Sequence, residues 1–130
     1  MKRLNPDTLF KPQAYTQVVE STRRRTIYVS GQVSMDAQGN LVAPGDFRGQ
    51  IRQVFSNLRA ALEAVGASPA DVTKMTTFVV DYKPELRAIV GEARAEFLGG
   101  SPPPASTLVG VTALADPAYL VEIEAIAVTE

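Results

Sequence analysis

Apolar and polar residues recur with two different periods along the 130-residue chain, and these periods predict its secondary structure. Alternation with a period of two predicts strands over residues 14–20 and 26–33, joined by a short turn. A third short strand is expected at Leu41-Val42, because residues 36–40 before it are turn-forming. The first third of the chain is therefore predicted to be an antiparallel meander.

Two later segments have the spacing of amphipathic helices. In the first, apolar residues recur every three or four positions between Asp46, a residue type favoured at helix N-caps, and Gly66, which suits the C-terminal end. The second begins at Pro84, which is suited to a first helical turn, and ends before Gly99-Gly100. Both helices have one apolar stripe, so each is expected to pack one face against a sheet.

Three more strands complete the predicted order β-β-β-α-β-α-β-β, over residues 71–81, 107–113 and 119–129. This order favours an α+β fold in one domain spanning residues 1–130, with both helices on one face of a mixed sheet. The last strand is apolar on both sides. The sheet face without helices is therefore expected to be covered by identical subunits.

Composition removes several classes of function. The chain has no cysteine and no histidine, so it cannot form a thiolate nucleophile, a Ser-His-Asp triad, a disulfide or an imidazole metal site, and no metal is expected. Acid or base catalysis would fall to Glu, Asp, Tyr, Lys, a bound water or backbone groups. With 13 basic and 14 acidic residues, the chain also lacks the positive charge that nucleic acid binding requires.

The remaining sequence gives no sign of a targeting or membrane segment. No apolar signal core follows Met1, and no apolar stretch reaches membrane-spanning length, so a cytoplasmic location is expected. The one basic run, Arg23-Arg24-Arg25, precedes an apolar strand. We interpret it as a solvated approach to that strand rather than an anion site, because three charges release few counterions.

Glu122 is the most informative residue, because it is an acid within a strand otherwise built for burial. An unpaired buried carboxylate is costly, so such a residue has a hydrogen-bonding role, a raised pKa or both. It either is satisfied by backbone amides or a cation across an interface, or positions or deprotonates a water. Gly31 interrupts a regular strand, which marks either a close approach to the backbone or a bulge. Ser106 and Thr107 follow three prolines, which either shape a pocket or end the preceding helix connection.

Short sequence words along nearly the whole chain identify a resemblance to the RidA (YjgF/YER057c/UK114) family of reactive-intermediate deaminases. These words include Asn5-Pro6, Ser30-Gly31-Gln32-Val33, Gly39-Asn40-Leu41-Val42, Asn57-Leu58 and Val121-Glu122-Ile123-Glu124-Ala125-Ile126-Ala127. The resemblance implies a chorismate-mutase-like α+β subunit that forms a homotrimer with a pocket at each subunit interface. The resemblance also implies an activity: the deaminases of this family hydrolyse imines and enamines, such as 2-aminoacrylate, to a keto acid and ammonia without a cofactor.

The resemblance also implies roles for individual residues. Tyr15, Gly31 and Glu122 match the family's pocket tyrosine, its glycine backbone and the glutamate that orients water. Tyr15 has an alternative interpretation as an amphipathic interface residue. Ser106 stands where the family carries the arginine that holds the substrate carboxylate, with Thr107 after it. The family's frequent asparagine on the second helix falls near Ile89 or Val90, and one extra residue lies between Leu114 and Leu120.

Loss of the arginine limits what the resemblance implies. A guanidinium binds a carboxylate through two charge-assisted hydrogen bonds, and removing one partner of such a pair costs about 2 to 5 kcal/mol. Arg87 and Arg94 are possible substitutes, but their positions off the apolar stripe predict exposure to solvent.

Two hypotheses follow. The first is an imine or enamine hydrolase with an altered substrate. The second is a non-catalytic trimer that binds small carbonyl or carboxylic metabolites, such as keto acids. A ribonuclease or translation inhibitor, a third activity associated with the family, is disfavoured by the neutral composition.

Overall fold

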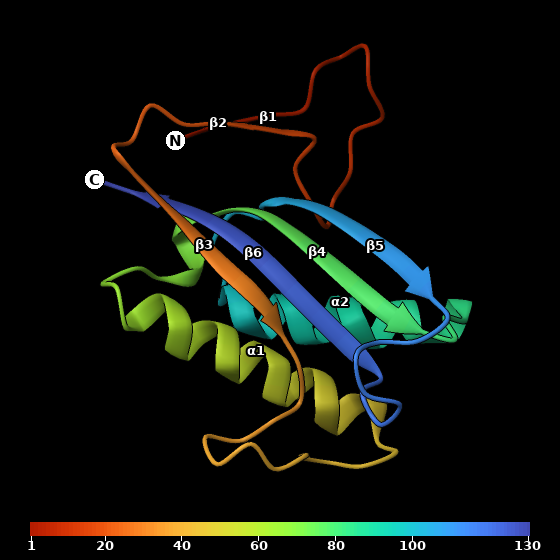
Figure 1. The fold of residues 1–130 in the computed structure, drawn as a ribbon. Coiled ribbons are helices and arrows are strands. Elements are labelled where there is room, and N and C mark those ends of the chain that lie inside the picture. Colours follow the sequence, from red (N-terminus) through yellow and green to blue (C-terminus); the bar gives the residue numbers. More distant parts are fainter.

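The structure is a computed structural model that describes residues 1–130. It contains six strands, two α-helices and one short 3₁₀ helix (Figure 1). In chain order these are β1 (Lys2–Leu4), β2 (Val18–Glu20), β3 (Arg25–Gln32), α1 (Phe47–Glu63), η1 (Pro69–Asp71), β4 (Val72–Val80), α2 (Pro84–Leu98), β5 (Ala105–Val111) and β6 (Val121–Thr129).

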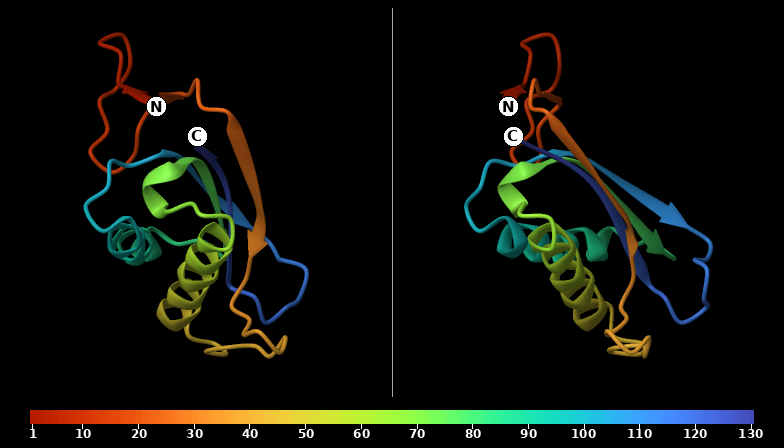
Figure 2. Two further views of the ribbon diagram at one scale, coloured as in Figure 1. Left: turned by 90° about the vertical axis from the view of Figure 1, so that its left-hand side faces the viewer. Right: turned by 60° about the vertical axis from the view of Figure 1, so that its left-hand side comes forward.

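Four strands form the main sheet in the order β3-β6-β4-β5. Strand β6 is antiparallel to both of its neighbours, whereas β4 and β5 are parallel and are connected by α2. Both helices lie on the same face of this sheet (Figures 1 and 2). The structure therefore confirms the predicted α+β class, with two helices packed on one face of a mixed sheet.

The hydrophobic core fills the space between the sheet and the helices. Alternate residues of β6 face the helices and are almost completely buried, as are those of β4, because side chains alternate between the two faces of a strand. The principal contributors from the sheet and from α1 are Met75, Val79, Val121, Ile123, Ala125, Ala127, Ile51, Val54, Leu58 and Leu62. The opposite face of the sheet, called the open face below, has no layer of its own chain over it (Figure 2).

The predicted N-terminal meander is wrong. Strand β2 pairs with β1 in a separate two-stranded sheet, and β3 pairs with the C-terminal β6. Leu41 forms only an isolated bridge with Met35. The predicted strand over residues 14–20 shortens to β2, because Thr16 donates its backbone N–H and its hydroxyl to carbonyls of the distant segment Pro103-Pro104. Alternation identifies residues that suit a strand, but it does not identify their partners.

The predicted helix ends agree with the structure except at the end of α1, which lies at Glu63, three residues before Gly66. The Asp46 carboxylate accepts the backbone N–H of Gly49 and caps α1, and Gly66, with φ of 73°, lies in the turn that ends the helix region. Pro84 occupies the first turn of α2 and Gly99 is its left-handed C-cap. Neither helix combines the length and the apolar character that a membrane-spanning helix requires.

Several strand boundaries differ from prediction. Strand β5 spans Ala105–Val111 rather than residues 107–113, and β6 begins at Val121 rather than Tyr119. The residues before β6 are held by Gln50, a fully buried side chain of α1 that sequence reasoning did not single out. Its amide donates to the carbonyl of Ala118 at 3.0 Å and accepts the N–H of Leu120 at 3.0 Å. A buried amide of the helix thus takes the place of a strand partner.

Replacing this amide should destabilise the protein. In Gln50→Leu, the Ala118 carbonyl and the Leu120 N–H each lose their partner, and we expect the free energy of unfolding to fall by about 2 to 4 kcal/mol. Urea denaturation measures this loss. The control is Gln53→Leu, whose amide donates to Asn57 on the same helix at 2.9 Å and which should lose less than about half as much. Equal losses for the two variants would contradict the role given to Gln50.

Candidate functional site

Glu122 and Gly31 lie side by side on the open face of the sheet. Glu122 alternates with the buried Val121 and Ile123, so its side chain points away from the helices. A Cβ atom on Gly31 would overlap the Glu122 carboxylate, with Oε1 as the nearest atom and Cδ at 2.8 Å. The register between β3 and β6 also shifts between Val29 and Gln32. Both explanations of Gly31, a bulge and a close approach, therefore apply.

The Glu122 carboxylate has no partner within its own chain. None of the four ion pairs includes it, and no side-chain hydrogen bond uses its oxygens. The residue is only partly exposed, whereas Glu124, two positions later on the same face, is exposed. Phe78 of β4 is its neighbour in the ladder. The free lone pairs of this carboxylate can accept hydrogen bonds from a water or a ligand. They lie beside the aromatic side chain of Phe78 and the backbone of Gly31, which has no side chain.

Helix α1 holds the chain that leaves β3 immediately after Gly31. The Asn57 amide donates to the carbonyls of Val33 and Met35 at 3.0 and 2.9 Å. The hydroxyl of the buried Ser34 donates to the Val42 carbonyl at 2.6 Å. These bonds fix the backbone on one side of the Gly31–Glu122 contact. In the sequence Asn57 is visible only as a polar residue within the first helix, so its function as an anchor was missed.

Ser106 lies in a different part of the fold, near the beginning of β5. It is aligned with the buried Met75 of β4, so its side chain faces the helices. The guanidinium of Arg94, on α2, donates from Nη1 to the Ser106 hydroxyl at 3.4 Å. Arg94 is partly buried, so the predicted exposure of this residue is wrong; Arg87 is exposed as predicted. The apolar stripe locates the core side of α2, but it does not show that Arg94 reaches Ser106 of the edge strand β5.

Tyr15 belongs to the same corner of the fold as Ser106. The backbone N–H of its neighbour Thr16 donates to the Pro104 carbonyl at 2.9 Å, two residues before Ser106. The Thr16 hydroxyl donates to the Pro103 carbonyl. Pro103 and Pro104 thus hold the N-terminal loop, and Tyr15 is partly exposed there. We refer to Tyr15, Arg94 and Ser106 together as the β5 corner.

Thr107 is separated from Ser106 by the alternation of the strand. Its side chain lies on the open face, where its hydroxyl accepts a hydrogen bond from Lys74 Nζ at 2.6 Å. Thr107 is aligned with Thr76, and Thr76 with Glu124, so it is also displaced along the sheet from Glu122. The two neighbouring residues of the predicted site therefore point to opposite faces.

The structure brings Gly31 and Glu122 together but keeps them apart from the β5 corner. Strand β4 lies between β6 and β5, which places Glu122 and Ser106 about 10 Å apart across the sheet and about 10 Å apart along it. Their side chains also leave opposite faces. No pocket within one chain can hold both, so a ligand that contacts both groups would have to lie between two copies of the chain.

The basic run before β3 is used to hold the strand in place. Arg23 pairs with Asp71 at 2.8 Å and donates to the Val128 carbonyl at 3.2 Å, and Arg25 donates to the Val65 carbonyl at 3.1 Å. These contacts agree with a role at the beginning of the strand. No group of acidic residues in the chain is arranged to hold a metal ion.

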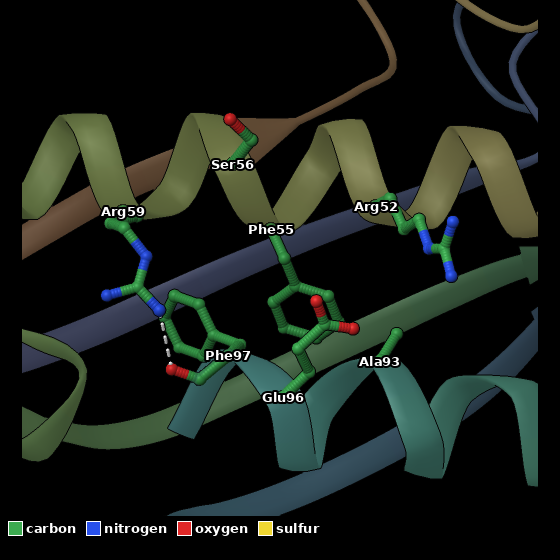
Figure 3. Close-up of a pocket in the computed structure, with 7 residues that line it drawn as sticks. All are labelled: Arg52, Phe55, Ser56, Arg59, Ala93, Glu96 and Phe97. Carbon is green, nitrogen blue, oxygen red and sulfur yellow. Dashed lines mark hydrogen bonds between the residues drawn. The ribbon is translucent and has the colours of Figure 1, made fainter. Parts of the chain in front are cut away.

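A cavity of the chain lies elsewhere, in the groove between α1 and α2 (Figure 3). It has a volume of about 250 Å³ and includes none of the predicted site residues. Phe55 and Phe97 form its floor with ring centroids 4.9 Å apart, and Arg59 lies over the Phe97 ring and donates to the Phe97 carbonyl at 2.9 Å. This groove results from packing two helices. Of its two cations, Arg59 is held by the C-terminal end of α2, and Arg52 forms no ion pair.

Comparison with known proteins gives the family of the chain. The family model described as Endoribonuclease L-PSP matches residues 8–129. A 2-iminobutanoate/2-iminopropanoate deaminase of Dermatophagoides farinae is 38% identical over 116 residues, which cover 89% of this chain and 86% of the relative.

Solved structures give the same result. YyfB of Yersinia pestis, from the conserved Rid protein family, has a TM-score of 0.93 at 38% identity and covers 98% of both chains. E. coli TdcF with bound serine has a TM-score of 0.71 at 30% identity, covering 92% of this chain and 91% of that one.

The two-helix, mixed-sheet fold places the chain in a class of small α+β proteins, and its relatives include a protein named as a 2-iminobutanoate/2-iminopropanoate deaminase. Within that class, the chain belongs to the RidA (YjgF/YER057c/UK114) family.

Proposed function

We propose that the chain forms a homotrimer whose subunit interfaces contain pockets for small molecules, and that it hydrolyses imines or enamines to keto acids and ammonia without a cofactor. The observation that carries this proposal is the Glu122 carboxylate, which lies unpaired over the Gly31 backbone on the open face. A free carboxylate in this position can bind a water and accept its proton.

The reaction needs one water and no redox partner. Glu122 accepts a proton from the water as its oxygen attacks the C=N carbon, and the imine nitrogen is protonated. The resulting carbinolamine loses ammonia when the C–N bond breaks and the C=O bond forms, and the protons removed from oxygen are returned to nitrogen. The carboxylate ends the cycle ionised, as it began. Gly31 contributes by leaving the approach to the carboxylate free of a side chain.

The trimer is supported by the apolar side chains that the open face carries beside its polar ones. Tyr28, aligned with Ile126, is 77% exposed in the single chain. Phe78 and Val109 occupy the same cross-strand row as Glu122. Exposed apolar surface of this kind favours association. Closed cyclic association would also bring the Gly31–Glu122 pair of one subunit towards another subunit's β5 corner, which the single chain keeps apart.

Ser106 is the reason for proposing an altered substrate. The deaminase relative is named for 2-iminobutanoate and 2-iminopropanoate, and the TdcF relative was solved with serine, so small amino-acid-like molecules are the expected ligand class. Ser106, however, cannot form the paired charge-assisted bonds of a guanidinium. The same residue favours the second candidate function, a non-catalytic trimer that binds such metabolites.

An assay with imino acids generated in place separates these two functions. An amino-acid oxidase converts a series of amino acids to imino acids, and keto-acid release is followed with and without the protein. We expect the wild-type protein to accelerate keto-acid release from at least one of these imino acids, and we expect no acceleration with Glu122→Gln. If no imino acid is hydrolysed faster and the keto acids still bind saturably, the hydrolase function would be rejected in favour of the metabolite-binding trimer.

A further inference from the structure

We propose that Arg94, on helix α2, supplies the cation that binds the ligand's carboxylate in this protein, at the position where Ser106 leaves the strand without one. This inference rests on the proposed ligand class, small molecules that carry a carboxylate next to the reacting carbon. It assigns the specificity of the site to a residue of the helix rather than of β5.

The geometry brings the guanidinium to the required position. Arg94 Nη1 lies 3.4 Å from the Ser106 hydroxyl, which is a long hydrogen bond, and this is the only hydrogen bond that the Arg94 side chain makes. A guanidinium has five N–H donors in a planar fork, so several remain free for a second acceptor. The Ser106 hydroxyl can donate to the same acceptor. The prolines that precede Ser106 and the docked N-terminal loop hold this corner in place.

The charges around Arg94 also favour an anion. None of the four ion pairs of the chain includes Arg94 or Arg87, although both extend from the same helix. Two of the three carboxylates on α2 point elsewhere, since Glu92 pairs with Arg48 at 2.7 Å and Glu96 lines the groove between the helices. The third, Glu85, lies in the first turn of α2, nine residues before Arg94. Burial lowers the pKa of Arg94 from its ordinary value, and the neighbouring charge of Arg87 lowers it further. A partly buried cation beside a like charge is stabilised when a carboxylate binds.

A purely structural role for Arg94 would be to tie α2 to β5 through Ser106. The two roles differ in what they require of the hydroxyl. If the hydrogen bond to Ser106 is the purpose of Arg94, Ser106→Ala should reproduce the effects of Arg94→Ser. If Arg94 binds an external carboxylate, Ser106→Ala should keep most of the affinity, because the guanidinium remains.

The experiment measures equilibrium binding of 2-oxobutanoate and of its uncharged analogue 2-oxobutanamide to the full-length protein by ligand-observed NMR. The wild type should prefer the carboxylate. Arg94→Ser should weaken 2-oxobutanoate binding about 30-fold to 1,000-fold and abolish this preference, with little change for the amide. Arg24→Ser removes one exposed positive charge far from the site and serves as the control, with less than about twofold change expected.

Moving the cation provides a second test that does not depend on how well one variant folds. The double variant Arg94→Ser/Ser106→Arg returns a guanidinium to the strand. Its affinity for 2-oxobutanoate should be at least a tenth of the wild-type affinity. Unchanged carboxylate binding in Arg94→Ser, or equal losses in Arg94→Ser and Ser106→Ala, would overturn the assignment.

These binding data separate this inference from the proposed hydrolase activity. Carboxylate-selective binding that depends on Arg94, without turnover of any imino acid, would support the inference and reject the hydrolase. Turnover whose KM for imino acids is unaffected by Arg94→Ser would support the hydrolase and reject the inference.

Discussion

Glu122→Gln is expected to lower kcat/KM for imino-acid hydrolysis by about 10²-fold to 10⁴-fold, the range by which a positioned general base contributes to catalysis. The amide keeps the size of the side chain but cannot accept a proton from water at neutral pH. Glu122 makes no hydrogen bond or ion pair within its chain, so the replacement should leave the free energy of unfolding within about 0.5 kcal/mol of wild type. Keto-acid release and urea denaturation measure the two quantities.

Glu124→Gln is the matched control for this variant. Glu124 has the same side chain, the same strand and the same face of the sheet, but it is exposed and lies opposite Thr76 rather than beside Gly31. It should retain activity within about threefold of wild type. Similar losses in the two variants would show that the charge of the open face matters and that no specific base is present at Glu122.

Gly31→Ala is expected to give the second largest effect, a fall in kcat/KM of about 10²-fold. The added Cβ would occupy the space of the Glu122 carboxylate, so that side chain must move, and a displacement of about 1 Å is enough to cost this much in rate. The backbone of Gly31 does not have a positive φ, so alanine introduces no conformational strain there.

Two comparisons make the Gly31 prediction specific. Gly91→Ala, on α2, adds a methyl group that meets nothing within 4 Å and should leave activity unchanged. In the double variant Gly31→Ala/Glu122→Gln, the two losses should not add, because both act through one carboxylate. Additive losses would place the effect of Gly31 somewhere other than on Glu122.

The sequence predicted those parts of the fold that depend on local patterns. The helix beginning at Asp46 and the helix between Pro84 and Gly99 follow from periodicity and end signals that act within a few residues. Strands β3 to β6 were found for the same reason, with boundaries that shifted by two residues at β5 and β6. Strand β1 was not predicted, and Leu41-Val42 forms no strand. The N-terminal meander was wrong because pairing is decided by distant segments: β3 pairs with β6, about a hundred residues later in the chain.

The candidate site was predicted less completely, for a related reason. Gly31 and Glu122 were each singled out from the sequence, as a glycine in one strand and an acid in another. Their contact was not predicted, because sequence patterns alone do not place those strands side by side. Strand alternation could have shown that Ser106 and Thr107 point to opposite faces. The partial burial of Arg94 could not be found this way, because it depends on where the distant strand β5 lies relative to α2.

The central claim is that the catalytic base, Glu122, and the carboxylate-binding group, Arg94, come from different subunits. Subunit mixing tests this claim most directly. Glu122→Gln and Arg94→Ser trimers, each with low activity, are mixed in equal amounts under conditions that exchange subunits. In a cyclic trimer with shared sites, every mixed trimer contains one site with both groups intact, so activity should recover to about a quarter of the wild-type value. If activity does not recover although mixed trimers have formed, the two groups do not act together across an interface.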